Sequence, residues 1–65
     1  MRVKDMIPYI TNRVIKINVN GAEVCRIFHI DGKYIDFPEK SYHEICDCTV
    51  IEIGAEITGI CLEVE

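Results

Sequence analysis

Four cysteines and a histidine are the residues of this sequence that could bind a metal ion or act as nucleophiles. Cys46 and Cys48 form a C-x-C pair, and His43 stands three residues before the first of them. With Cys61 or Cys25 as a further ligand, this group would offer a tetrahedral zinc site, and zinc binding would stabilise so small a domain. Zinc ribbons and fingers instead use paired C-x2-C knuckles. We therefore predict reduced structural thiols and no cofactor, with a zinc-stabilised domain as the alternative.

Nucleophilic catalysis would require more than the pair of His43 and Cys46, which lie on one side of a predicted helical turn. The neighbouring sequence offers no oxyanion donors, no glycine-rich turn and no third group to orient the histidine. The chain also contains no P-loop, no dinucleotide-binding fingerprint and no H-E-x-x-H motif. We therefore predict that the protein is not an enzyme and has no catalytic residues.

Two hairpin signals, Asn20-Gly21 and Asp31-Gly32, organise the first half of the chain. Each is flanked by alternating, β-branched sequence, which predicts a three-stranded antiparallel meander over residues 13–37. Two-residue loops would place Ile17 opposite Val24, and residues that are directly opposite share a face of the sheet. In this register the predicted buried face consists of Ile15, Ile17, Val19, Val24, Phe28, Ile30, Ile35 and Phe37.

The opposite face of the predicted meander carries a cluster of apolar residues among polar ones. Either a helical segment covers this cluster, or it binds a partner protein or a second copy of the chain. Arg26 would point toward the buried face in this register, which indicates either a side chain that reaches the solvent or a β-bulge in the central strand. The candidate interaction surface consists of Val14, Cys25, Ile27, His29 and Tyr34.

Short helical segments are predicted on either side of the meander. Apolar residues at helical spacing predict a helix over residues 5–11, with Asp5 as its N-cap. Ser41 and Glu44 have the spacing of a capping box, which predicts a helical turn over residues 42–46. The side chains that these segments should bury are Val3, Met6, Ile7, Ile10, Tyr42 and Ile45.

The last third of the chain predicts two more strands, over residues 48–53 and 58–64. The element order indicates a single, strand-dominated α+β domain over residues 1–65. We expect about five antiparallel strands in a small partly open barrel or curled sheet, with a short N-terminal helix and one helical turn before the fourth strand. Such a sheet has edge strands, which can recruit partners by strand addition.

The composition is that of a folded, soluble chain, with 49% hydrophobic and 28% charged residues. No apolar run approaches the ~20 residues that cross a bilayer, and the N-terminus lacks the pattern of a signal peptide, so we expect a cytoplasmic protein without membrane contact.

Residues 1–33 carry six basic and three acidic side chains, and residues 34–65 carry one basic and eight acidic. We expect the halves to neutralise each other across neighbouring strands, with a basic face for an acidic partner as the alternative.

Several segments are arranged in an order that spans nearly the whole chain: Val3-Lys4-Asp5-Met6-Ile7, Val14-Ile15-Lys16-Ile17, a glycine turn, a turn with Tyr42, and a closing Ile60-Cys61-Leu62-Glu63-Val64. In this order the chain resembles small uncharacterised proteins that phages and mobile elements of Gram-positive gut bacteria carry. The resemblance implies an assembly or regulatory adaptor, and no functional residue can be carried over from it.

The predicted function is that of a small protein-interaction or adaptor module, whose partner is another protein or a second copy of the chain. The zinc-stabilised domain is one alternative. The other is a weak binder of single-stranded nucleic acid, which would use Tyr34, His29 and Lys16; the net charge of −4 makes nucleic acid an unlikely partner.

Overall fold

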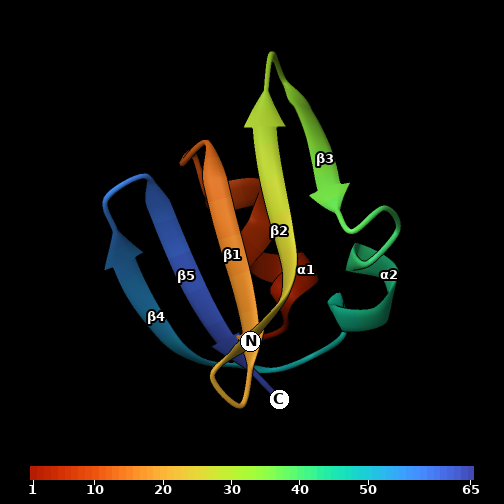
Figure 1. Ribbon diagram of the computed structural model, residues 1–65, viewed down its shortest axis with the longest axis vertical. Coiled ribbons are helices and arrows are strands. Elements are labelled where there is room, and N and C mark those ends of the chain that lie inside the picture. Colours follow the sequence, from red (N-terminus) through yellow and green to blue (C-terminus); the bar gives the residue numbers. More distant parts are fainter.

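The chain folds into a five-stranded mixed sheet with short helical segments against one of its faces (Figure 1). The computed structural model describes residues 1–65. In chain order, the elements are α1 (Val3–Met6), the 3-10 helix η1 (Ile7–Tyr9), β1 (Val14–Val19), β2 (Ala22–Ile30), β3 (Lys33–Phe37), α2 (Tyr42–Ile45), β4 (Val50–Glu56) and β5 (Gly59–Val64). The sheet order is β3-β2-β1-β5-β4, so β3 and β4 are its two edges. The predicted fold class, a curled open sheet with an N-terminal helix and a helical turn before the fourth strand, is confirmed.

Both predicted hairpin turns are present. Asn20 and Gly21 have φ values of 52° and 79°, and Asp31 and Gly32 have φ values of 51° and 77°. Positive φ at both central residues defines the type I′ turn, whose twist matches that of the flanking strands. The three-stranded meander is therefore confirmed, and β3 ends at Phe37, directly before a proline, as predicted.

The register between β1 and β2 differs from the prediction because β2 contains a β-bulge. The pairing beside the turn is as predicted, but it shifts between Ile17 and Asn18, and Ile17 pairs with Cys25 instead of Val24. Because of the extra residue, the side chain of each following residue of β2 points to the face of the sheet opposite to the predicted one. The register between β2 and β3 is as predicted, with Phe28 opposite Ile35, so β3 is reversed together with β2.

The predicted buried face is therefore correct for β1 and wrong for the residues beyond the bulge. We call the face of the sheet against the helical segments the covered face and the opposite one the open face. Phe28 lies on the open face and is half-buried, and the exposed apolar residues of β2 and β3 include Val24, Ile30, Ile35 and Phe37. The ten buried core residues are Val3, Ile7, Ile10, Ile15, Ile17, Cys25, Ile27, Ile45, Leu62 and Val64.

The helical segments cover Cys25 and Ile27 of the predicted apolar cluster of the second face, whereas Val14 of that cluster lies on the open face. In Figure 1, α1 lies behind β1 and β2. Cys25 and Ile27 are 1% and 2% exposed, so a covering helix, and not a partner, buries them. The predicted helical face is confirmed, because Val3, Ile7 and Ile10 are buried. The helix begins at Val3 and ends at Tyr9, however, and Asp5 is inside it instead of at its N-cap.

The C-terminal hairpin makes the sheet mixed instead of purely antiparallel. The chain crosses the lower end of the sheet in Figure 1 after α2, so that β4 forms the far edge and β5 lies between β4 and β1. β5 runs parallel to β1, with Ile15 opposite Ile60 and Ile17 opposite Leu62. The expectation of antiparallel pairing throughout is wrong at this one pair of strands.

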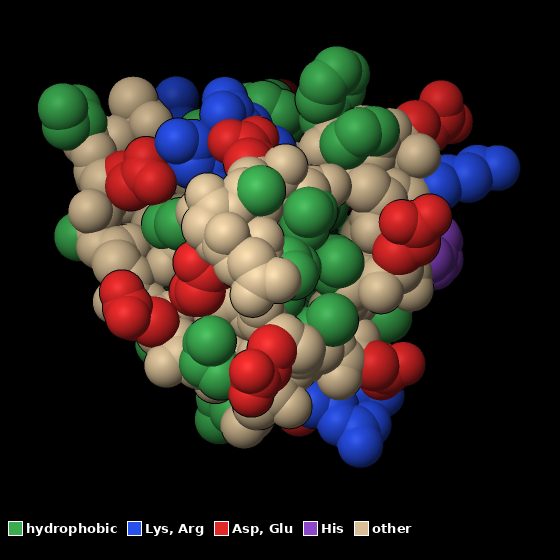
Figure 2. All heavy atoms as spheres, turned by 60° about the horizontal axis from the view of Figure 1, so that its bottom comes forward, with side chains coloured by type: hydrophobic (Ala, Val, Ile, Leu, Met, Phe, Trp, Pro, Cys, Tyr) green, Lys and Arg blue, Asp and Glu red, His purple; other side chains and the backbone are tan.

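Ion pairs connect the two oppositely charged halves of the chain, although, contrary to the prediction, none of these pairs joins neighbouring strands. Three of the five ion pairs join residues of the basic first half to acidic residues of the second half: Arg2–Asp47, Lys4–Asp47 and Lys16–Glu56. Acidic side chains still spread over the side of the molecule shown in Figure 2, while basic ones lie toward its rim. None of the helices is long and apolar enough to span a lipid bilayer.

Candidate functional site

The four cysteines are separate free thiols. Cys25 is buried and its sulfur accepts a hydrogen bond from the Ser41 hydroxyl at 3.1 Å; burial raises the pKa of the Cys25 thiol and that of Cys61. The Cys46 thiol points to the main-chain carbonyl of His43, at 3.7 Å. The structure brings no three His, Cys, Asp or Glu side chains together as a metal site. The zinc ligands proposed from the sequence, including Cys48, are thus not assembled into a site.

The candidate interaction surface from the sequence is divided between three places. Val14 pairs with Phe28 and lies on the open face. Cys25 and Ile27 are part of the core. His29 and Tyr34 remain accessible as a cross-strand pair whose rings stack, with centroids 4.5 Å apart and planes at 10°.

The proposed nucleic-acid surface is not brought together either. Lys16 pairs with Arg26 on the open face, whereas His29 and Tyr34 point to the other side of the sheet. The Lys16 ammonium is instead 3.1 Å from the carboxylate of Glu56.

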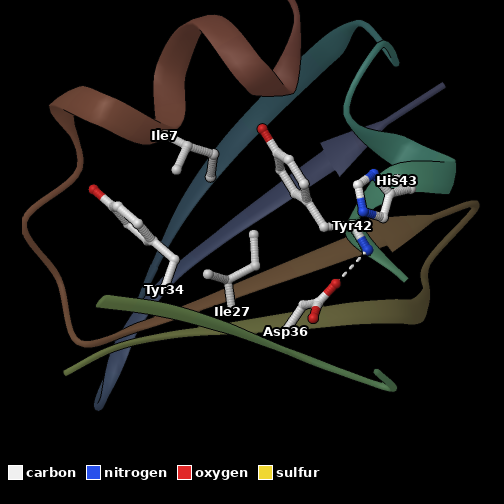
Figure 3. Close-up of a pocket in the computed structure, with 6 residues that line it drawn as sticks. All are labelled: Ile7, Ile27, Tyr34, Asp36, Tyr42 and His43. Atoms are coloured by element: carbon white, nitrogen blue, oxygen red, sulfur yellow. Dashed lines mark hydrogen bonds between the residues drawn. The ribbon is translucent and has the colours of Figure 1, made fainter. Parts of the chain in front are cut away.

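A pocket of about 280 Å³ opens at the edge of the sheet where β3 meets the helical segments (Figure 3). Tyr34 and Asp36 both reach it from β3, because alternate residues of a strand share a face, and Ile27 reaches it from β2, directly opposite Asp36. In Figure 3 the ring of Tyr34 extends from β3 and the ring of Tyr42 from α2, both toward η1, with the side chains of Ile7 and Ile27 between them. The lining residues are Ile7, Ile27, Tyr34, Asp36, Tyr42 and His43.

The Asp36 carboxylate positions α2 beside this pocket. It accepts hydrogen bonds from the main-chain N–H of Tyr42 at 2.8 Å and from that of Lys40 at 3.2 Å. The Tyr42 hydrogen bond, together with that from Lys40, holds the pKa of Asp36 below its usual value.

The predicted capping box is wrong, because Ser41 makes no side-chain bond to the helix and instead contacts Cys25. The role of Asp36 was not predicted from the sequence, where its one signal was a carboxylate between the apolar residues Ile35 and Phe37.

We expect Asp36→Asn to lower the melting temperature at neutral pH and to flatten its dependence on acid. Because the folded-state pKa is below the ~3.9 of an unfolded aspartate, the carboxylate stabilises the fold fully above that value. This contribution is lost as the pH falls through the folded-state pKa, and the asparagine variant has no such contribution to lose. Circular dichroism melts of both proteins from pH 7 to pH 2 measure the difference.

Glu39→Gln is the matched control, because Glu39 is exposed and lies three residues after Asp36, in the loop that connects β3 to α2. Its melting curves should follow those of the unmodified protein. If the melting temperatures of Asp36→Asn and of the unmodified protein decreased equally with falling pH, the Asp36 carboxylate would not hold α2.

The two edges of the sheet differ in how they are protected. None of the main-chain hydrogen bonds outside the helices and strands involves residues 33–37, so the outer edge of β3 is unpaired. The start of β4, in contrast, is covered by the N-terminus, since Val50 donates a hydrogen bond to the Met1 carbonyl and Arg2 bridges to Thr49. A register shift at Ile51 also interrupts β4. Bulges and covering segments are common protections of edge strands, and β3 lacks both.

Comparison with known proteins gives no relative of this chain: no protein-family model, no curated protein and no solved structure matches it.

Proposed function

We propose that the chain is a protein-interaction module that binds an extended segment of a partner protein as a sixth strand along β3. The observation that supports this most directly is that β3 combines an unpaired main-chain edge with exposed apolar side chains. Ile35 and Phe37 are 55% and 69% exposed on this strand. Strand addition uses main-chain hydrogen bonds for affinity and alternate side chains for specificity. An adaptor of this kind also fits the role that the resemblance to phage and mobile-element proteins implies.

The main-chain groups of β3 have the right arrangement for strand addition. In a hairpin with a two-residue turn, the pair that flanks the turn, here Ile30 and Lys33, exchanges both hydrogen bonds. Hydrogen-bonded pairs alternate with non-bonded ones along an antiparallel ladder. The N–H and C=O groups of Tyr34 and Asp36 therefore point away from β2, where no strand follows. A partner segment can bond to both residues.

The open face next to β3 extends the apolar surface beyond the edge itself. Val14, Phe28 and Ile35 lie directly opposite one another and form an apolar row across β1, β2 and β3. Ile30, 50% exposed, and Phe37 flank this row on the same face. Contiguous exposed apolar surface of this kind marks interaction sites in soluble proteins.

Selection of a phage-displayed library of linear seven-residue peptides against the immobilised full chain tests the proposal. We expect enriched peptides with alternating apolar residues, whose binding slows hydrogen exchange of the Tyr34 and Asp36 amides in NMR spectra. The variant Ile35→Arg should weaken binding of these peptides by about tenfold or more, because it places a charge in the centre of the interface.

Ile53→Arg is the matched control, since Ile53 is 54% exposed on the opposite edge strand and Ile35 is 55% exposed. It should leave binding unchanged. A selection that enriches no peptide, or peptides that protect β4 instead of β3, would refute the proposal. So would a dimer of this chain in sedimentation that Ile35→Arg dissociates, since β3 would then belong to a second copy.

A further inference from the structure

We infer that the pocket beside β3 receives a basic side chain, lysine or arginine, from the bound partner segment. This inference rests on the proposed function, because it concerns a side chain of the added strand.

The position of the pocket makes it accessible to an added strand. Tyr34 and Asp36, whose main-chain groups point to the free edge, also direct their side chains to the pocket. A residue of the added strand that lies opposite either of them points to the same face of the sheet, at a Cβ distance of about 4.5–5.5 Å. Alternate side chains of the partner therefore enter the pocket. The side chains between them lie beside Ile35 and Phe37 on the open face.

The lining of the pocket favours a cation with an aliphatic stem. Asp36 is the one carboxylate among the lining residues, and its hydrogen bonds from Tyr42 and Lys40 use only part of the acceptor capacity of its two oxygens. The lowered pKa of Asp36 keeps this carboxylate ionised at neutral pH. An acidic partner side chain would be repelled there, and a purely apolar one would leave the remaining acceptor positions of the carboxylate without a donor.

The aromatic and aliphatic walls provide the remaining contacts. Tyr34, one ring face of which stacks on His29, and Tyr42 line the pocket, and aromatic ring faces attract ammonium and guanidinium groups. Ile7 and Ile27, which lie between the two rings in Figure 3, can pack against the methylene stem of a lysine or arginine. The net charge of −4 also favours a basic partner segment over an acidic one.

The test uses the full chain and three peptides of the form acetyl-Val-Thr-Val-Xaa-Val-Thr-Val-amide, with lysine, norleucine or glutamate at Xaa. The valines then face the apolar open side and Xaa faces the pocket. We expect the lysine peptide to bind about tenfold more tightly than the norleucine peptide, and the glutamate peptide most weakly, in NMR titrations. Tyr34→Leu should reduce the preference for lysine, whereas Tyr34→Phe, which retains the ring, should preserve it.

The outcomes separate this inference from the proposed function. If none of the three peptides protects the Tyr34 and Asp36 amides, the proposed function fails and this inference fails with it. If the peptides bind along β3 but norleucine binds as tightly as lysine, the inference is wrong and the proposed function stands. A lysine preference that Tyr34→Leu does not reduce would reflect the overall charge of the protein and would also overturn the inference.

Discussion

Replacing Ile27 by alanine is expected to unfold a large fraction of the protein at 25 °C. Ile27 is 2% exposed, and its side chain points from β2 into the core. Truncation of a buried isoleucine costs about 2–5 kcal/mol, because transfer free energy is lost and a cavity remains. A core of this size is expected to provide only about 3–5 kcal/mol of net stability. Urea titration followed by far-UV circular dichroism measures the loss.

Ile35→Ala is the matched control, since it makes the same chemical change on the neighbouring strand. Ile35 is 55% exposed on the open face, and its truncation should cost less than about 1 kcal/mol. The pair of variants tests the bulge in β2 directly. Without the bulge, Ile35 would lie in the core and Ile27 outside it, and the order of the two effects would be inverted.

Replacing Gly59 by alanine is expected to destabilise the protein by about 1–3 kcal/mol, or more if the strand cannot shift. Gly59 begins β5, where a Cβ atom would collide with the main-chain carbonyl of Val14 in β1. Main-chain atoms inside a sheet cannot move aside as a flexible side chain can. The substitution would therefore force β5 away from β1 at the start of their parallel pairing, which a decrease in the melting temperature and in the urea midpoint would show.

Gly54→Ala provides the comparison, because nothing lies within 4 Å of a Cβ atom built at Gly54 in β4. We expect this variant to be neutral or slightly more stable than the unmodified protein, since glycine in a strand has a larger entropic cost of ordering than alanine. Equal destabilisation by both substitutions would mean that the general loss of glycine flexibility, and not contact with Val14, determines the effect at Gly59.

Local signals in the sequence predicted the first half of the fold well. The Asn20-Gly21 and Asp31-Gly32 dipeptides determine the hairpins through their own backbone preferences. A β-bulge has no comparable local signature. A single extra residue at Val24 was therefore enough to invert the facing of the rest of β2 and all of β3. Arg26 was the one residue that indicated it, because a charge in the predicted core conflicts with burial.

Non-local contacts account for what the sequence did not predict. Parallel pairing of β5 with β1 depends on where the chain crosses after α2, and no residue pattern specifies that path. The same is true of the candidate site. Tyr34 was predicted as a surface residue and is exposed. Asp36, in contrast, holds α2 beside the pocket through the main-chain N–H groups of Lys40 and Tyr42, and any residue type could provide these groups.

The placement of the last strand beside the first has a consequence for how this protein folds. β1 pairs with β5 through partners as distant in sequence as Ile15 and Ile60. During synthesis, the first hairpins must therefore leave the ribosome with Ile15 and Ile17 still lacking their C-terminal neighbours. High contact order of this kind slows folding to about milliseconds or longer. The nascent chain thus exposes the edge of β1 until β5 has also left the ribosome, and the five-stranded sheet is completed only then.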